Sequence, residues 1–138
     1  LDELSTARPA VAVLAGGGSN TIDEVRLAIE RRMRIVVIEG TGGLADQLAA
    51  IARSTAKPQA ADPVGALVVE GDLTFVSIDA LHAEGRLAAD AHVARLMILG
   101  AINYSATWYR ARPRGRRGVD LDTLAAETSA LFLREVPR

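Results

Sequence analysis

Two segments of this 138-residue chain share one layout, in which a short apolar run ends in a glycine-rich corner that opens an amphipathic helix. The first apolar run covers residues 9–15 and the second covers residues 35–38. A short, continuous apolar run bounded by Pro or Gly is typical of a strand buried in a parallel sheet. Parallel neighbours require a crossover connection, which is right-handed in nearly all proteins. We therefore expect an α/β fold built on a partial, Rossmann-like parallel sheet.

The segments around these strands predict further elements. Thr21 followed by Glu24 forms a capping box, so a helix is expected to start there. A second helix is expected from Leu44 to about Arg53. Residues 74–78 resemble a strand, and residues 66–69 are either another strand or the end of a short helix that leads into it. A small sheet with two covering helices is expected for this half.

The alternation of strands and helices stops near residue 80. Residues 87–109 follow a 3.6-residue period that predicts one long helix. A last helix, covering residues 121–133, is expected to be capped by Asp120. The sequence thus predicts two parts, an α/β segment over residues 1–79 and a helical segment over residues 80–138.

The centre of the long helix, residues 96–102, is apolar on every side. A helix of this kind must be buried on every side, and a small domain offers little to cover it. We therefore expect a homodimer held by residues 87–109 and 121–133. In the competing arrangement, the long helix lies across the open face of the sheet and the last helix packs over it.

Composition excludes several functions. With 16 Lys and Arg against 17 Asp and Glu, the net charge of −1 creates no general attraction to nucleic acid or to acidic membranes. The absence of Cys excludes thiolate chemistry, and two His are too few for a histidine-built metal site. No apolar run is long enough to span a membrane and the first residues carry no signal-peptide pattern, so we expect a cytoplasmic protein. The arginine-rich segment 110–117 is interpreted as a solvated loop.

No catalytic arrangement is evident, because no Ser has a recognisable His partner and no pair of carboxylates has a spacing that suggests acid–base chemistry. An enzyme is therefore not predicted, and no cofactor is assigned beyond a possible nucleotide-derived ligand. Tyr104, Trp108 and Tyr109 are interpreted as interface or core residues.

The two glycine-rich corners are the candidate binding site. Loops at the carboxyl ends of neighbouring parallel strands lie along one edge of a sheet, so the corners are expected to share a crevice. Each corner leads into a helix N-terminus, whose free N–H groups and dipole suit a phosphate. Alternatively, the glycines are simply what tight strand-to-helix turns require. The predicted ligand-binding residues are Gly16, Gly17, Gly18, Ser19, Asn20, Thr21, Glu39, Gly40, Thr41, Gly42 and Gly43.

Residues 11–25 and 35–46, which contain both corners, resemble the SLOG superfamily in its LSDAT branch, related to the amino-terminal domain of TRPM channels. The resemblance covers about residues 9–79. It implies a Rossmann-like domain that senses a nucleotide-derived ligand such as a relative of NAD or ADP-ribose. Family members carry a further βαβ portion ahead of the region that is matched here. The ligand positions implied by the resemblance are Gly16, Gly17, Asn20, Thr21, Glu39, Gly40, Thr41 and Gly42.

The second half resembles the carboxyl-terminal helices of TetR-type transcriptional regulators over residues 82–136, mainly through the segment 95–110. In that family the last two helices form a four-helix dimer interface. The first interpretation of the chain is thus a non-catalytic sensor of a nucleotide-derived ligand. The alternative is a set of ligand-binding and dimerisation helices from a TetR-type regulator without its DNA-binding domain. Two unrelated resemblances, and a first residue that is Leu1, suggest a trimmed or chimeric chain.

Overall fold

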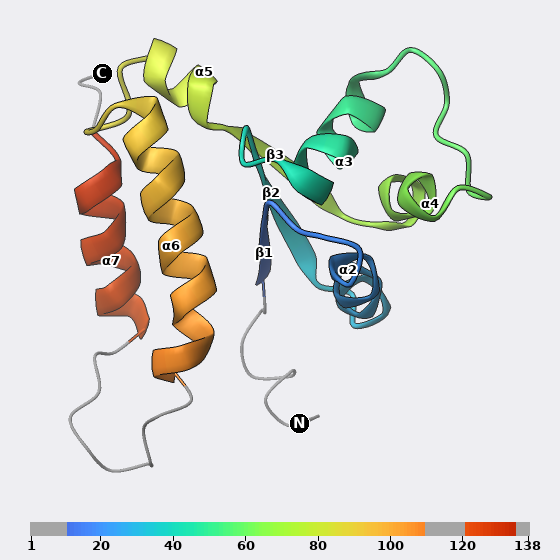
Figure 1. Cartoon of the computed structure of the whole chain (residues 1–138), viewed down its shortest axis with the longest axis horizontal. Helices are drawn as coiled ribbons and strands as arrows, with labels where there is room; N and C mark the ends of the chain where they lie inside the picture. The colour runs from blue at the N-terminus through green and yellow to red at the C-terminus, as the bar shows by residue number, and fades with distance from the viewer. Residues whose placement is uncertain (1–10, 110–120, 135–138) are drawn as a thin grey trace. The chain divides into compact units, whose positions relative to one another are not determined.

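The computed structural model describes residues 11–109 and 121–134 of the chain, and of these it leaves out the side chains of residues 102–109, 121–125 and 132 (Figure 1). Strands and helices alternate first, and helices follow. In chain order the elements are β1 (Val11–Ala15), α2 (Thr21–Glu30), β2 (Arg34–Glu39), α3 (Gly43–Arg53), α4 (Pro63–Glu70), β3 (Leu73–Ser77), α5 (Ile78–Ala83), α6 (Ala91–Tyr109) and α7 (Leu121–Phe132).

The three strands form one parallel sheet in the order β1-β2-β3. Val36 in the central strand pairs with Val13 on one side and Thr74 on the other. The predicted α/β fold, with the first two strands parallel, is confirmed. It corresponds to a partial Rossmann-like sheet.

Helices α2, α3 and α4 lie on the same side of this sheet (Figure 1). Both crossovers advance in the same direction along the sheet, and two right-handed crossovers of that kind place their helices on one face. The strand residues that point to these helices are buried, as Ile35 and Val37 show at 1% and 0% exposure. They pack with apolar residues of the three helices, including Val25, Leu48 and Leu67.

The segment 66–69 belongs to helix α4, so its interpretation as a strand is wrong and the alternative, a short helix leading into β3, is right. Pro63 occupies the first turn, where its missing N–H costs nothing. The carboxylate of Asp62 caps the helix by accepting a hydrogen bond from the Gly65 N–H at 2.8 Å. These start signals outweigh the strand preference of the β-branched residues that follow.

Three further details differ from the sequence-based expectations. Thr21 is the first residue of α2 and Asn20 the cap, without a side-chain capping bond. The hydroxyl of Thr21 accepts instead from the Gly18 N–H at 3.1 Å, so it anchors the preceding loop. Ile78 starts the short helix α5, which was not predicted.

The long helix starts at Ala91 rather than at Leu87. Asp90 determines this boundary, since its side chain accepts from the His92 N–H at 2.9 Å. Leu87 lies outside the helix in an isolated antiparallel bridge with Leu133. The last helix is present, whereas its expected cap, Asp120, and the segment 110–117 lie outside the described residues.

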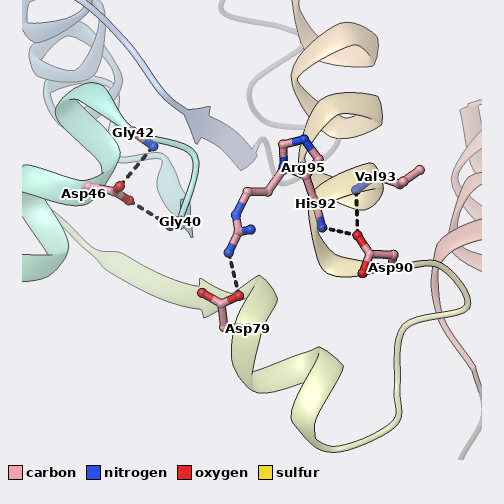
Figure 2. A network of polar contacts seen from close by, with 8 residues as sticks. All are labelled: Gly40, Gly42, Asp46, Asp79, Asp90, His92, Val93 and Arg95. Atoms are coloured by element: carbon pink, nitrogen blue, oxygen red, sulfur yellow. Dashed lines mark hydrogen bonds and ion pairs between the residues drawn. The ribbon is translucent and has the colours of Figure 1, made fainter.

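The chain divides into two compact units, Leu1–Ser77 and Ile78–Arg138. In the second unit, Arg95 of α6 forms an ion pair with Asp79 of α5 at 2.5 Å (Figure 2). The apolar centre of α6 is not covered on every side, because Leu96 is 58% and Met97 is 49% exposed in the single chain. The side chains of Tyr104, Trp108 and Tyr109 are outside the described part.

Candidate ligand-binding site

The first glycine-rich corner follows β1 and leads into α2. Gly16 and Gly17 have φ angles of 65° and 104°, values that side-chain-bearing residues rarely adopt. The Thr21 backbone N–H donates to the Gly18 carbonyl oxygen at 3.1 Å, and the Thr21 hydroxyl accepts from the Gly18 N–H. Thr21 therefore holds this corner from the first turn of the helix.

The second corner follows β2 and leads into α3. Gly40, Gly42 and Gly43 all have positive φ angles. The carboxylate of Asp46, in the first turn of α3, accepts from the Gly40 N–H at 2.7 Å and from the Gly42 N–H at 3.0 Å (Figure 2). Asp46 was not among the predicted site residues. An acidic residue in the first turn after a glycine-rich corner is the signal that could have indicated it.

The two corners are joined directly. The Thr41 hydroxyl accepts from the Gly16 N–H at 2.8 Å and donates to the Ile38 carbonyl at 2.6 Å. The N–H groups of Leu44 and Ala45, at the start of α3, donate to the carbonyls of Gly17 and Gly16, each at 3.0 Å. The structure thus brings together the segments 16–21 and 39–43, which contain all the residues predicted from the sequence.

The structural requirement for glycine differs between positions of the two corners. A Cβ on Gly43 would lie 2.3 Å from the Gly17 carbonyl oxygen, so the close approach of the corners requires glycine there. A Cβ on Gly18 would meet nothing within 4 Å, and Gly18 is not among the glycines with positive φ. Tight packing of the two turns therefore accounts for Gly43 but not for Gly18.

Backbone donors remain at the first corner. Within the described part of the chain, the N–H groups of Gly17, Ser19 and Asn20 donate to no protein acceptor. Gly18, Ser19 and Asn20 are exposed. These groups lie at the N-terminus of α2, where the helix dipole favours an anion.

Glu39, one of the predicted ligand-binding residues, has its carboxylate engaged within the protein. Its carboxylate is buried, with the residue 9% exposed, and both of its oxygens accept from the guanidinium of Arg53 at the end of α3. Sequence reasoning did not identify Arg53 as part of the site. The two residues are 14 positions apart, at opposite ends of a loop and helix, and no local pattern links them.

Two further observations on the described residues concern metal binding and membrane insertion. Among the side chains that are described within residues 11–109 and 121–134, no three of His, Asp or Glu gather as a metal site would require. Over the same ranges, no helix combines the length and the apolar character needed to cross a lipid bilayer.

A parallel sheet whose first two strands end in adjoining glycine-rich corners defines a Rossmann-like α/β module. The family model described as "SLOG in TRPM, prokaryote" matches residues 1–86, which is more than half of the chain, and the chain belongs to this prokaryotic LSDAT family. The match indicates a nucleotide-related module. It supports the predicted SLOG resemblance and gives no support to the TetR resemblance of the second half. No curated protein and no solved structure matches the chain.

Proposed function

We propose that the first unit is a non-catalytic sensor module that binds a nucleotide-derived ligand, a relative of NAD or ADP-ribose, with a phosphate at the glycine-rich corners. The observation that carries this proposal is the first corner, where the N–H groups of Gly17, Ser19 and Asn20 have no protein acceptor in the described chain. Membership of the SLOG family supports a nucleotide as the source of the phosphate.

The charged groups of the corners support binding rather than catalysis. Both oxygens of Glu39 accept from Arg53, and both oxygens of Asp46 accept from backbone N–H groups. A general base needs an oxygen directed at the proton it removes, whereas these carboxylates hold the fold of the loop.

Calorimetry with the full chain tests the proposal, using NAD, ADP-ribose and AMP as ligands. The matched variants are Gly18→Ala and Gly100→Ala, because a Cβ at either position meets nothing within 4 Å of the protein. We expect Gly18→Ala to weaken ligand binding by about tenfold, equivalent to roughly 1.4 kcal/mol, by placing a methyl group where the ligand approaches. Gly100→Ala should bind like the wild type. No binding at millimolar ligand, or equal affinity in both variants, would refute the site.

We also propose that residues 87–109 and 121–133 form a homodimer interface. The exposed side chains of Leu96 and Met97 support it, since burying one such side chain is worth about 1.5–3 kcal/mol. Sedimentation of Leu96→Glu should show a folded monomer where the wild type is a dimer. Leu27→Glu is the matched control, an exposed leucine on α2 (46% against 58% for Leu96) whose substitution should leave the dimer intact. A wild-type monomer at micromolar concentration would exclude the interface.

The alternative, a pair of regulator helices without a DNA-binding domain, remains a prediction for the second unit. It would gain support from a stable dimer that binds none of the nucleotides. A dimer that binds a nucleotide favours the sensor.

A further inference from the structure

The second glycine-rich corner already holds a negatively charged group. Asp46 places one carboxylate oxygen 2.7 Å from the Gly40 nitrogen and the other 3.0 Å from the Gly42 nitrogen (Figure 2). A bound phosphate would use the same pair of backbone donors, because two converging N–H groups at a helix N-terminus form an anion site. The carboxylate therefore occupies this position from within the chain.

Two further donors in the first turn of α3 are engaged, whereas the N–H groups of Thr41 and Gly43 donate to no acceptor in the described part of the chain. Leu44 and Ala45 donate their N–H groups to the carbonyls of Gly17 and Gly16, each at 3.0 Å. A phosphate at the Gly40 and Gly42 donors would have to displace Asp46, and a phosphate at another donor of this corner would meet the charge of Asp46 at close range. Like charges at that distance repel.

The first corner differs in this respect. No carboxylate accepts from its N–H groups in the part of the chain that the structure describes. The acidic residues in the first turn of α2 are Asp23 and Glu24, both exposed. Asp23 pairs with Arg26 at 3.5 Å rather than with the corner. The donors of Gly17, Ser19 and Asn20 stay available.

We propose that Asp46 is a specificity-determining residue, which closes the second corner to phosphate and confines the anionic group of the ligand to the first. The inference rests on the proposed function of the corners. An ionised carboxylate offers about four acceptor positions and Asp46 uses two of them, so the second corner can still accept hydrogen bonds from neutral hydroxyl groups. The ligand class that fits is a phosphate joined to a hydroxyl-bearing sugar.

The first experiment removes the internal carboxylate from the full chain and uses inorganic phosphate as the probe. Asp46→Ala frees two backbone donors, and we expect phosphate to raise its melting temperature more than it raises that of the wild type. Asp62→Ala is the matched control, because the Asp62 carboxylate also accepts from a backbone N–H close to the start of a helix, that of Gly65 at 2.8 Å, away from the corners. Its response to phosphate should equal that of the wild type.

Two results of this experiment would overturn the inference. One is an Asp46→Ala variant that gains no more from phosphate than the wild type. The other is an equal gain in both variants, which would be a general effect of phosphate on weakened proteins. In a third case, the wild type binds no nucleotide, but phosphate still raises the melting temperature of Asp46→Ala more than those of the wild type and Asp62→Ala. The proposed function then fails while the role of Asp46 stands.

A second measurement needs no variant and covers the case in which Asp46→Ala does not fold. Titration of ¹⁵N-labelled wild-type protein with inorganic phosphate should shift the amide resonances of Gly17, Ser19 and Asn20 more than those of Gly40 and Gly42. Larger shifts at Gly40 and Gly42 would show that the anion displaces Asp46, and would overturn the inference.

Discussion

The α/β unit and the helical unit bury their apolar side chains to very different extents. In the first unit, Val37, Ala45 and Leu48 are 0% exposed, whereas Leu96 and Leu131 of the second unit are 58% and 70% exposed. The strands and helices of the first unit alternate, so each layer covers its neighbour. A pair of long helices offers one mutual seam and leaves its other apolar residues uncovered.

The contrast is not complete, because the first unit also has uncovered apolar residues. Val11 and Val13 of β1 are each 53% exposed. Both lie on the edge strand and point away from the face that α2, α3 and α4 cover. The comparison therefore teaches that burial follows layering: the covered face of the sheet is a complete core, and surfaces without a second layer remain exposed.

The largest expected effect tests the core directly. Leu48→Ala should lower the free energy of unfolding by about 2–5 kcal/mol, because it leaves a cavity among buried neighbours. Leu96→Ala, the same substitution at an exposed position, should cost less than about 1 kcal/mol in the monomer. Chemical denaturation at low protein concentration measures both. Equal losses of unfolding free energy in the two variants would contradict the difference in burial between the two units.

The next effect compares one glycine from each unit. Gly43→Ala should cost about 1–3 kcal/mol from the backbone strain at φ +56° alone, and its Cβ would also collide with the Gly17 carbonyl. Gly100→Ala should stabilise α6 in the monomer by up to about 1 kcal/mol, since alanine favours a helix and nothing lies within 4 Å. Thermal unfolding of both variants gives the sign of each change in stability. A destabilised Gly100→Ala monomer would contradict the open surroundings of Gly100.

A smaller difference in stability is expected between variants that remove the arginine of one ion pair in each unit. Arg53→Met leaves the buried Glu39 carboxylate without its partner, at a cost of about 1–3 kcal/mol, between the values for surface and buried pairs. Arg95→Met removes the partner of Asp79, a 70% exposed side chain that water can solvate, and should cost about 0–1 kcal/mol. Denaturant midpoints at neutral pH measure the two. A larger loss for Arg95→Met would reverse the expected order.

The smallest expected effect is the pH dependence of α6. Hydrogen bonds from the backbone N–H groups of His92 and Val93 lower the pKa of Asp90 below its ordinary value of 3.8 (Figure 2). Because the folded-state pKa is the lower one, this contribution to stability is complete above the unfolded-state pKa and is lost as the pH falls through the folded-state pKa.

The control for that effect is Asp90→Asn, which retains a good helix cap but cannot titrate in this range. The melting temperature of the wild type relative to Asp90→Asn should therefore fall between pH 6 and pH 2.5. Circular dichroism of the two proteins measures it. A difference that stays constant over this range would show that the charge of Asp90 does not contribute.

The sequence by itself determined the parallel strands, the helices that follow them and the two glycine-rich corners. Apolar periodicity and the glycines that follow the ends of strands are local signals. In the α/β unit these local preferences agree with the final packing. Residues 66–69 are the clearest exception. There the apolar run suits a strand or a buried helix equally, and the Asp62 cap with Pro63 decides for the helix.

Only the tertiary structure determined which polar groups of the two corners pair with each other and with α3. The Glu39–Arg53 pair and the bond from the Gly16 N–H to Thr41 span 14 and 25 positions, and they form because the strands and α3 bring those groups together. The bridge between Leu87 and Leu133 likewise joins residues that are far apart in the sequence. A periodic pattern specifies which face of a segment is apolar, whereas the partner of each polar group is fixed only when distant segments meet.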